Sequence, residues 1–121
     1  LILFLLVAGV VGSIVPMIEP LIKLGIDILD PLQVSADNMD PHFIKDQFGS
    51  RLCLHGSMDT QFLLPKGTPE EVRYKARSMI DILGKGGGFI LSPSHVLQTD
   101  VPTENIKALY EEGFKFLPEY R

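Results

Sequence analysis

The side chains that could carry out chemistry in this sequence gather directly after three short apolar runs. The runs are IDIL at 26–29, SRLCLHG at 50–56 and KGGGFIL at 85–91. The polar groups at or just beyond their ends are Asp30, Gln33 and Ser35, then His55, Ser57, Asp59 and Gln61, then Ser92, Ser94, His95, Gln98 and Asp100. Imidazole, carboxylate, hydroxyl and amide groups that converge on one place can bind a polar small molecule and move protons.

His95 is the strongest single candidate for a catalytic residue in this set. We expect substrate contacts from its companions at the strand ends, which are Gln33, Asp59, Gln61, Ser92 and Ser94. Other polar residues have simpler interpretations: Asp30 precedes Pro31 and can shape a turn, Asp100 can cap the last helix, and His42 is expected to be solvated. For His55 two interpretations remain open: a partly buried histidine whose hydrogen bonds are made within the fold, or a functional residue.

A repeated unit explains how these groups would be positioned. An amphipathic stretch ends in a hydrophobic residue and a glycine, at Leu24-Gly25, Phe48-Gly49 and Leu83-Gly84, and an apolar run of strand length follows. Glycine just past a helix favours the left-handed cap conformation.

Helix starts alternate with these ends. Asp40-Pro41 and Thr68-Pro69 are typical cap pairs, and Glu71 completes a capping box with Thr68. Pro102-Thr103 opens the last helix. The spacing predicts one buried face of Val72, Ala76, Met79, Ile80 and Leu83, and another of Ile106, Leu109, Tyr110 and Gly113.

Strands that alternate with helices in this way predict an α/β fold with parallel strands and right-handed crossovers. Four βα units in 121 residues are half of a TIM (β/α)8 barrel, which takes about 250 residues. A free-standing, four-stranded doubly wound domain is the alternative. Because half a barrel exposes strand edges and the first residue is Leu1 rather than Met, we expect this chain to be a fragment, with its true start upstream.

The glycine-rich stretch GKGGGFILSPSH at 84–95 resembles a phosphate-binding loop only in composition. Such a loop follows a strand and opens a helix, so that the anion meets the helix N-terminus. Here Gly86, Gly87 and Gly88 follow a predicted helix and precede a predicted strand. The sequence therefore predicts a helix-to-strand connection with a solvated Lys85.

Composition narrows the class of protein further. The net charge is −4 and the basic residues form no cluster, so we expect no nucleic-acid partner. Cys53 is the only cysteine, which favours a reducing cytoplasm. Residues 1–18 carry no charge. A buried strand from Leu1 to about Ala8 and a turn explain them better than a membrane span, because Gly9, Gly12 and Pro16 interrupt the run.

Four stretches in order carry a family resemblance: LHGSMDTQ at 54–61, LPKGTPEEVR at 64–73, GKGGGFILSPSH at 84–95 and DVPTENIKALYE at 100–111. They resemble the carboxyl-terminal half of the uroporphyrinogen decarboxylase (URO-D) family over roughly residues 12–117. The resemblance implies a TIM barrel whose strands five to eight lie in this chain. Residues 1–121 would then be a partial barrel domain, and residues 1–11 would be either its native strand or foreign sequence in its place.

The family has two main branches, and the resemblance leaves both open. Decarboxylases convert uroporphyrinogen III to coproporphyrinogen III in porphyrin and heme biosynthesis without metal or organic cofactor, by protonating a pyrrole so that the carboxylate can leave. Corrinoid-dependent methyltransferases use a zinc held by a His-x-Cys pair and a later cysteine. That pair falls here on Gly9 and Val11, and His95 stands at the later position, where decarboxylases have a histidine. The stretch VPMIEPLIKLGIDILDP at 15–31 instead resembles the methyltransferase members.

We therefore expect this chain to be a fragment of a cytoplasmic decarboxylase-type lyase. It would bind tetrapyrrole carboxylates, without cofactor, metal, nucleic acid or membrane, and homodimerisation is left open. The methyltransferase alternative would bring a methyl donor and a corrinoid protein as partners, and a non-catalytic ligand-binding half-barrel is a further alternative. Because the catalytic aspartate and the arginines of the family belong to the amino-terminal half, we expect the fragment alone to be inactive.

Overall fold

The computed structural model describes residues 7–9 and 13–116. The sequence predicts a strand from Leu1 to about Ala8. The described residues include only the end of this strand, as β1 (Val7–Gly9). Residues 1–6 and Val11 lie outside the described residues, so the structure does not test whether residues 1–11 are native or foreign. No helix in the described ranges is both long enough and apolar enough to cross a bilayer.

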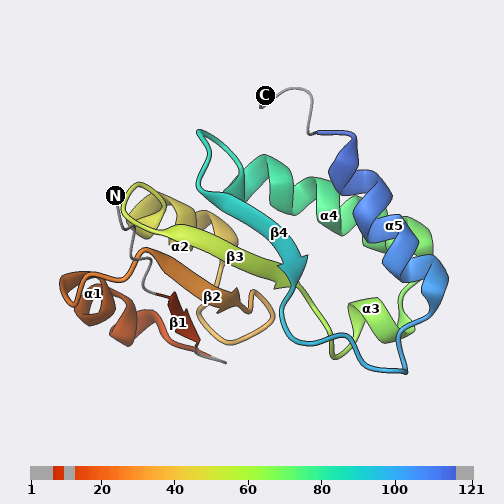
Figure 1. Cartoon of the computed structure of the whole chain (residues 1–121), viewed down its shortest axis with the longest axis horizontal. Helices are drawn as coiled ribbons and strands as arrows, with labels where there is room; N and C mark the ends of the chain where they lie inside the picture. The colour runs from red at the N-terminus through yellow and green to blue at the C-terminus, as the bar shows by residue number, and fades with distance from the viewer. Residues whose placement is uncertain (1–6, 10–12, 117–121) are drawn as a thin grey trace, which may run out of the picture.

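The described strands form one parallel sheet in the order of the sequence. β1 pairs with β2 (Ile28–Leu32), β2 with β3 (Cys53–Met58), and β3 with β4 (Phe89–Pro93). The register between β2 and β3 is irregular between Leu29 and Leu32, where β2 carries an additional residue. The arrowheads of β2, β3 and β4 all point toward the lower right of Figure 1.

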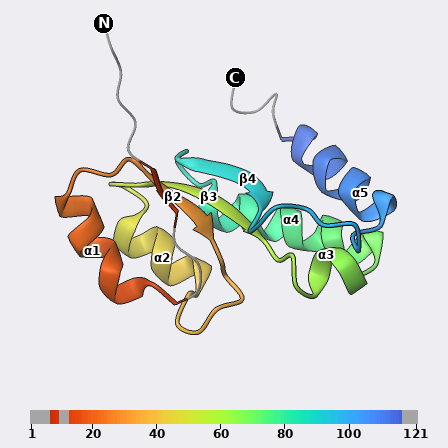
Figure 2. The same ribbon diagram turned by 60° about the horizontal axis from the view of Figure 1, so that its bottom comes forward.

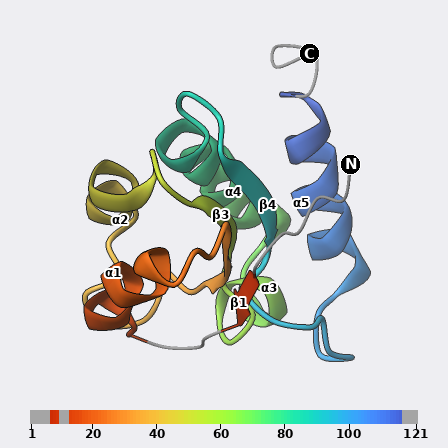
Figure 3. The same ribbon diagram turned by 60° about the vertical axis from the view of Figure 1, so that its left-hand side comes forward.

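The helices connect these strands as predicted, with one short helix that the sequence did not indicate. They are α1 (Val15–Lys23), α2 (Pro41–Phe48), α3 (Leu63–Lys66), α4 (Pro69–Leu83) and α5 (Thr103–Phe114). Figure 2 shows α1, α2, α3 and α4 on one side of the sheet, and Figure 3 shows α5 next to α4 at the β4 edge. A doubly wound sheet reverses its strand order and has helices on both faces, so the described residues do not have that arrangement.

The helix caps confirm the predicted starts. The backbone N–H of Phe43 donates to the Asp40 carboxylate at 2.9 Å. Thr68 and Glu71 form both bonds of the capping box, at 3.2 Å to the Thr68 hydroxyl and 2.9 Å to the Glu71 carboxylate. Each cap satisfies backbone donors that an open helix end leaves unpaired. The expected cap from Asp100 is wrong, because α5 begins after Pro102 with no side-chain cap.

The buried face of α4 contains all five residues that the periodicity indicated. The prediction for α5 was less accurate, since Tyr110 is exposed and Gly113 is half-buried. The buried residues of α5 are Asn105, Ala108, Leu109 and Glu112. Two of these are polar, and each is buried because it has partners: Asn105 bonds to backbone carbonyls, and Glu112 bonds to Arg77 and Lys115.

The expected left-handed glycine caps are found at only one of the three helix ends. Gly25 has a φ of 93°, but Gly49 and Gly84 have helical φ values of −63° and −79°. The last turns of α2 and α4 continue to the glycine, and left-handed residues follow in the connection after α4 but not in the one after α2. After α4 they are Gly86, Gly87 and Gly88.

Candidate ligand-binding site at the strand ends

The glycine stretch is a helix-to-strand connection, as predicted. Gly86, Gly87 and Gly88 have φ values of 75°, 88° and 75° between the end of α4 and the start of β4. Lys85 is exposed, and the ammonium group of Lys45 donates to the Gly87 carbonyl at 2.8 Å. The connection joins the amino-terminal end of β4, so it lies at the end of the strand opposite to the predicted site.

At the carboxyl ends of the strands, a pocket of about 370 Å³ opens between three loops. Its lining comes from the loop after β2 (Gln33), the loop after β3 (Thr60 and Gln61) and the loop after β4 (Ser94, His95, Val96 and Gln98). The structure thus brings together His95, Gln33, Gln61 and Ser94, which are distant in sequence. The parallel strands explain this, because their carboxyl ends meet at one edge of the sheet.

Ser94 holds the strand ends in place beneath this pocket. Its hydroxyl donates to the carbonyl of Leu32 at 3.2 Å, and its backbone N–H donates to the carbonyl of Met58 at 2.8 Å. Ser94 is 4% exposed. The residue therefore ties the end of β4 to the ends of β2 and β3, and fixes the backbone that carries the exposed side chain of His95.

Asp59 organises the loop on the β3 side of the pocket. One carboxylate oxygen accepts from the backbone N–H groups of Phe62 and Leu63 at 2.8 and 2.9 Å. The other accepts from the N–H of Gln61 and the hydroxyl of Ser35, each at 3.3 Å. Burial raises the pKa of Asp59, but these hydrogen bonds together outweigh burial and hold that pKa below its usual value.

Asp59 and Ser92 therefore lie beside the pocket, and the expectation that they contact a substrate stays a prediction. Both oxygens of Asp59 already have partners in the chain. The hydroxyl of Ser92 donates to the carbonyl of Pro93 at 3.0 Å. Across the strand pair, Ser92 is opposite Ser57, which has a φ of 85° and a buried hydroxyl with no hydrogen-bond partner among the described residues.

Two of the lining residues were not predicted. Thr60 lies between the predicted residues Asp59 and Gln61, and Val96 follows His95. Val96 is 74% exposed and places an apolar surface beside the imidazole of His95. The pocket can therefore bind a ligand with both polar and apolar parts.

The described residues offer no set of ligands for a metal ion. Within 7–9 and 13–116, no three His, Cys, Asp or Glu side chains are grouped so that they could hold one. Cys53 lies within β3, and burial raises the pKa of its thiol, partly offset by Lys45. A protonated thiol is a poor metal ligand. The expectation of a metal-free site is therefore tested by experiment below.

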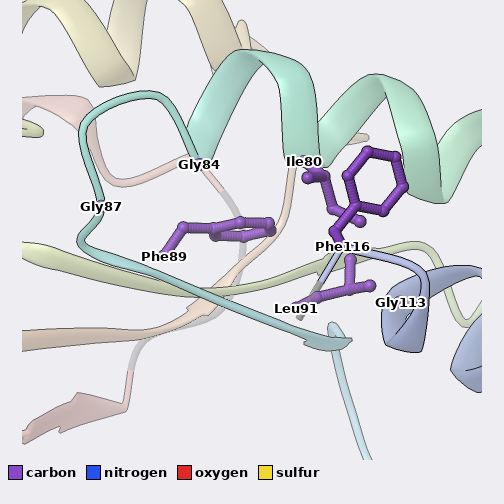
Figure 4. Close-up of a pocket in the computed structure, with 7 residues that line it drawn as sticks. All are labelled: Ile80, Gly84, Gly87, Phe89, Leu91, Gly113 and Phe116. Carbon is purple, nitrogen blue, oxygen red and sulfur yellow. The ribbon is translucent and has the colours of Figure 1, made fainter. Parts of the chain in front are cut away.

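A second pocket, of about 270 Å³, lies between β4, α4 and α5 and has no chemical groups suited to catalysis. Its lining is apolar or glycine: Ile80, Gly84, Gly87, Phe89, Leu91, Gly113 and Phe116 (Figure 4). Phe89 and Leu91 belong to β4, so this space lies beside the sheet. We therefore place the functional site at the strand ends.

Comparisons with known proteins agree with the sequence motifs. A family model described as uroporphyrinogen decarboxylase (URO-D) matches residues 10–114. A uroporphyrinogen decarboxylase of Psychromonas ingrahamii is 34% identical over 67 residues, which are 55% of this chain and 18% of that protein. One of an Anaeromyxobacter species is 31% identical over 99 residues, which are 82% of this chain and 27% of that protein.

Among solved structures, a methyltransferase from Methanosarcina mazei has a similar fold. It superposes with a TM-score of 0.75 at 21% sequence identity and covers 93% of this chain and 31% of the methyltransferase. The chain thus spans about a fifth to a third of these relatives. Since the family model covers most of the sequence, the chain belongs to the uroporphyrinogen decarboxylase family.

Proposed function

We propose that this chain forms the carboxyl-terminal part of a (β/α)8 barrel and one wall of its active-site cleft. Three observations support the proposal: the strand order follows the sequence, the connecting helices lie on one face, and the chain spans only part of its relatives. A barrel is built from βα units in this arrangement, and its cleft lies at the carboxyl ends of the strands. The edge of β4 and the apolar space beside it are where a further unit would pack.

The reaction we propose is that of a carboxy-lyase, the decarboxylation of uroporphyrinogen III to coproporphyrinogen III in porphyrin and heme biosynthesis. The observation that carries it is the pocket containing His95, Gln33 and Gln61 in a member of this family. The lining residues include imidazole and amide donors and no Asp or Glu. A substrate carboxylate would therefore find hydrogen-bond donors there without a neighbouring negative charge.

In this proposal His95 donates a hydrogen bond to a substrate carboxylate, and Val96 contacts the apolar tetrapyrrole. Ser94 and Asp59 keep the two loops in position. The protonation of the pyrrole and the departure of the carboxylate depend on groups supplied by the rest of the barrel. The chain alone is accordingly proposed to be inactive.

The test is His95→Ala in the full-length protein that contains this chain. We expect turnover of uroporphyrinogen III to fall about tenfold or more, the effect of losing one charge-assisted hydrogen bond of about 1.5 to 3 kcal/mol. The melting temperature should stay nearly constant, because His95 is exposed. His42→Ala, which removes an exposed histidine from α2, is the matched control and should leave turnover unchanged.

An active His95→Ala variant would contradict the proposed role of His95. Binding of uroporphyrin without turnover by the full-length wild-type protein would instead favour the non-catalytic ligand-binding alternative.

Zinc content separates this proposal from a corrinoid-dependent methyltransferase. We expect the purified full-length protein to hold no stoichiometric zinc, because Gly9 offers no ligand and His95 has no Cys or second His beside it among the described residues. Elemental analysis after dialysis measures this directly. One tightly held zinc per chain would overturn the decarboxylase proposal and support the methyltransferase branch.

A further inference from the structure

The sheet has an open face that carries a pair of polar residues outside the pocket. Leu29 and Leu54 are fully buried under the helices, so the alternation of side chains along β2 and β3 places Asp30 and His55 on the opposite face. Ile90, opposite His55 in the strand pairing, is 44% exposed on this face. Helices α1, α2, α3 and α4 lie on the other side of the sheet, and α5 lies beside β4, where Tyr110 and Phe114 border the same pocket as Ile90 (Figure 2). In a closed barrel this face is the interior.

Asp30 and His55 contact each other across neighbouring strands. The Nδ1 atom of His55 lies 3.1 Å from a carboxylate oxygen of Asp30, and the two side chains are 32% and 38% exposed. With a proton on Nδ1, this contact with Asp30 orients the imidazole and leaves Nε2 as the second functional nitrogen. That nitrogen accepts a hydrogen bond when the ring is neutral and donates one when the ring is protonated.

The position of this pair is unfavourable for stability alone. Barrel interiors are filled mainly by branched apolar side chains. In the proposed closed barrel the pair would be removed from water, and such an ion pair is often no more stabilising than apolar residues of similar volume, because desolvation offsets the attraction between its charges. The pairing of Ile28 with Cys53 and of Leu29 with Leu54 places Asp30 beside His55 at the next position of the two strands.

We propose that His55 is a second ligand-contacting residue of the cleft and that Asp30 is the residue that positions it. The ligand group is a carboxylate, which accepts a hydrogen bond from the Nε2–H of the protonated His55 ring. His55 precedes the end of β3 by three residues, which places it about 10 Å deeper than the loop that carries His95. A ligand with several carboxylates could contact both histidines at once. This inference rests on the proposed barrel and deepens the proposed tetrapyrrole specificity.

The first experiment compares His55→Gln and Asp30→Asn in the full-length protein, with uroporphyrin as the probe of binding and uroporphyrinogen III as the substrate. We expect His55→Gln to weaken uroporphyrin binding and raise KM about tenfold, the effect of one lost hydrogen bond to a charged group. Asp30→Asn should give a smaller change in the same direction. His42→Gln is the matched control and should bind as the wild type does.

The second experiment separates a positioning role from a merely structural one. In imidazole nitrogen NMR spectra of the ligand-free protein, the neutral ring of wild-type His55 should show one predominant tautomer with the proton on Nδ1, and Asp30→Asn should mix the tautomers. A purely structural pair would change the melting temperature without changing KM. Unchanged binding and KM in a folded His55→Gln variant would overturn the inference.

A third measurement tests carboxylate binding at His55 separately from the proposed decarboxylase function. Succinate, a plain dicarboxylate, is titrated into the full-length protein while the His55 nitrogen signals are followed. A saturable shift of those signals supports the His55 site even if the wild type neither binds nor converts a tetrapyrrole, which would contradict only the proposed function. The absence of any shift at millimolar succinate, with uroporphyrin binding unaffected by His55→Gln, overturns the His55 site alone.

Discussion

At the scale of single residues, the carboxylate of Asp59 holds the loop after β3, which forms one side of the pocket. It accepts from three successive backbone N–H groups, those of Gln61, Phe62 and Leu63, and thereby orders the turn that leads into α3. Thr60 and Gln61, which line the pocket, belong to the same turn. A loop that places ligand groups is thus held by one anionic side chain.

We expect Asp59→Asn to lower the free energy of unfolding at pH 7 by about 1 to 3 kcal/mol, the effect of losing charge-assisted bonds to a nearly buried group. The pKa of Asp59 is depressed in the folded state. Its ionised form therefore stabilises the fold above about pH 4, and that contribution disappears as the pH falls through the folded pKa.

Denaturant unfolding of the full-length protein at several pH values measures this effect. The difference between the wild type and Asp59→Asn should shrink below about pH 4. Asp37→Asn, in an exposed loop, is the control. A difference that does not depend on pH would show that the charge of Asp59 is not what holds the turn.

Single residues also show the limits of prediction from sequence. Strand ends were recognisable, so His95, Gln33 and Gln61 could be expected to meet. The use of the Asp59 carboxylate within its own loop could not be read from spacing, because it depends on the path of the turn. The contact of His55 with Asp30 likewise depends on how β2 and β3 pair with each other, which the composition of the two strands does not show.

At the scale of elements, the helices are joined by buried polar side chains as well as by apolar faces. The side-chain amide of Asn105 on α5 donates to the carbonyls of Leu64 and Gly67, both at 2.8 Å. Leu64 lies on α3 and Gly67 ends it. Asn105 is 2% exposed, so it satisfies two carbonyls near the point where α3 leads into α4.

Asn105→Ala should therefore destabilise the full-length protein by about 2 kcal/mol, because it leaves one buried and one partly buried carbonyl without their donor. Thermal and denaturant unfolding measure the change. Glu104→Ala, an exposed neighbour on the same helix, is the control and should stay within about 0.5 kcal/mol of the wild type. Equal stability of the two variants would contradict the role assigned to Asn105.

The predictions for helices were confirmed where the spacing of residues within one turn or one helix determines the structure. The capping box of Thr68 and Glu71, the Asp40 cap and the apolar face of α4 each follow from spacing within one turn or one helix. The helix α3 was missed because Leu63–Lys66 is only four residues long and contains a proline. The inward residues of α5 were partly wrong, because polar Asn105 and Glu112 are buried by partners on other elements.

At the scale of the whole molecule, β4 has no partner strand at its outer edge among the described residues, and α5 lies beside that edge without burying Ile90. β4 ends the sheet, and Ile90 and Phe114 are exposed near it. An uncovered strand edge with apolar side chains favours association with another chain. The same surfaces would be covered in the proposed complete barrel.

We expect the isolated chain to associate or aggregate, and to become monodisperse when the missing part of the barrel is supplied on the same or a separate chain. Sedimentation measures the association. Ile90→Lys should reduce it by adding a charge to the open face of β4, whereas Tyr74→Lys, on the exposed side of α4, should not. A monodisperse, cooperatively unfolding isolated chain would contradict the half-barrel proposal.

The glycine connection after α4 has a consequence for chirality. At Gly86, Gly87 and Gly88 the backbone adopts φ values that are natural to D-amino acids. A Cβ atom at Gly86 or Gly87 would meet nothing within 4 Å, so the restriction there comes from backbone handedness and not from space. Replacing one of these glycines with any other L-amino acid therefore strains the backbone, even where the side chain would have open space. A semisynthetic chain with D-alanine at Gly86 would keep the native path and lose less conformational entropy on folding.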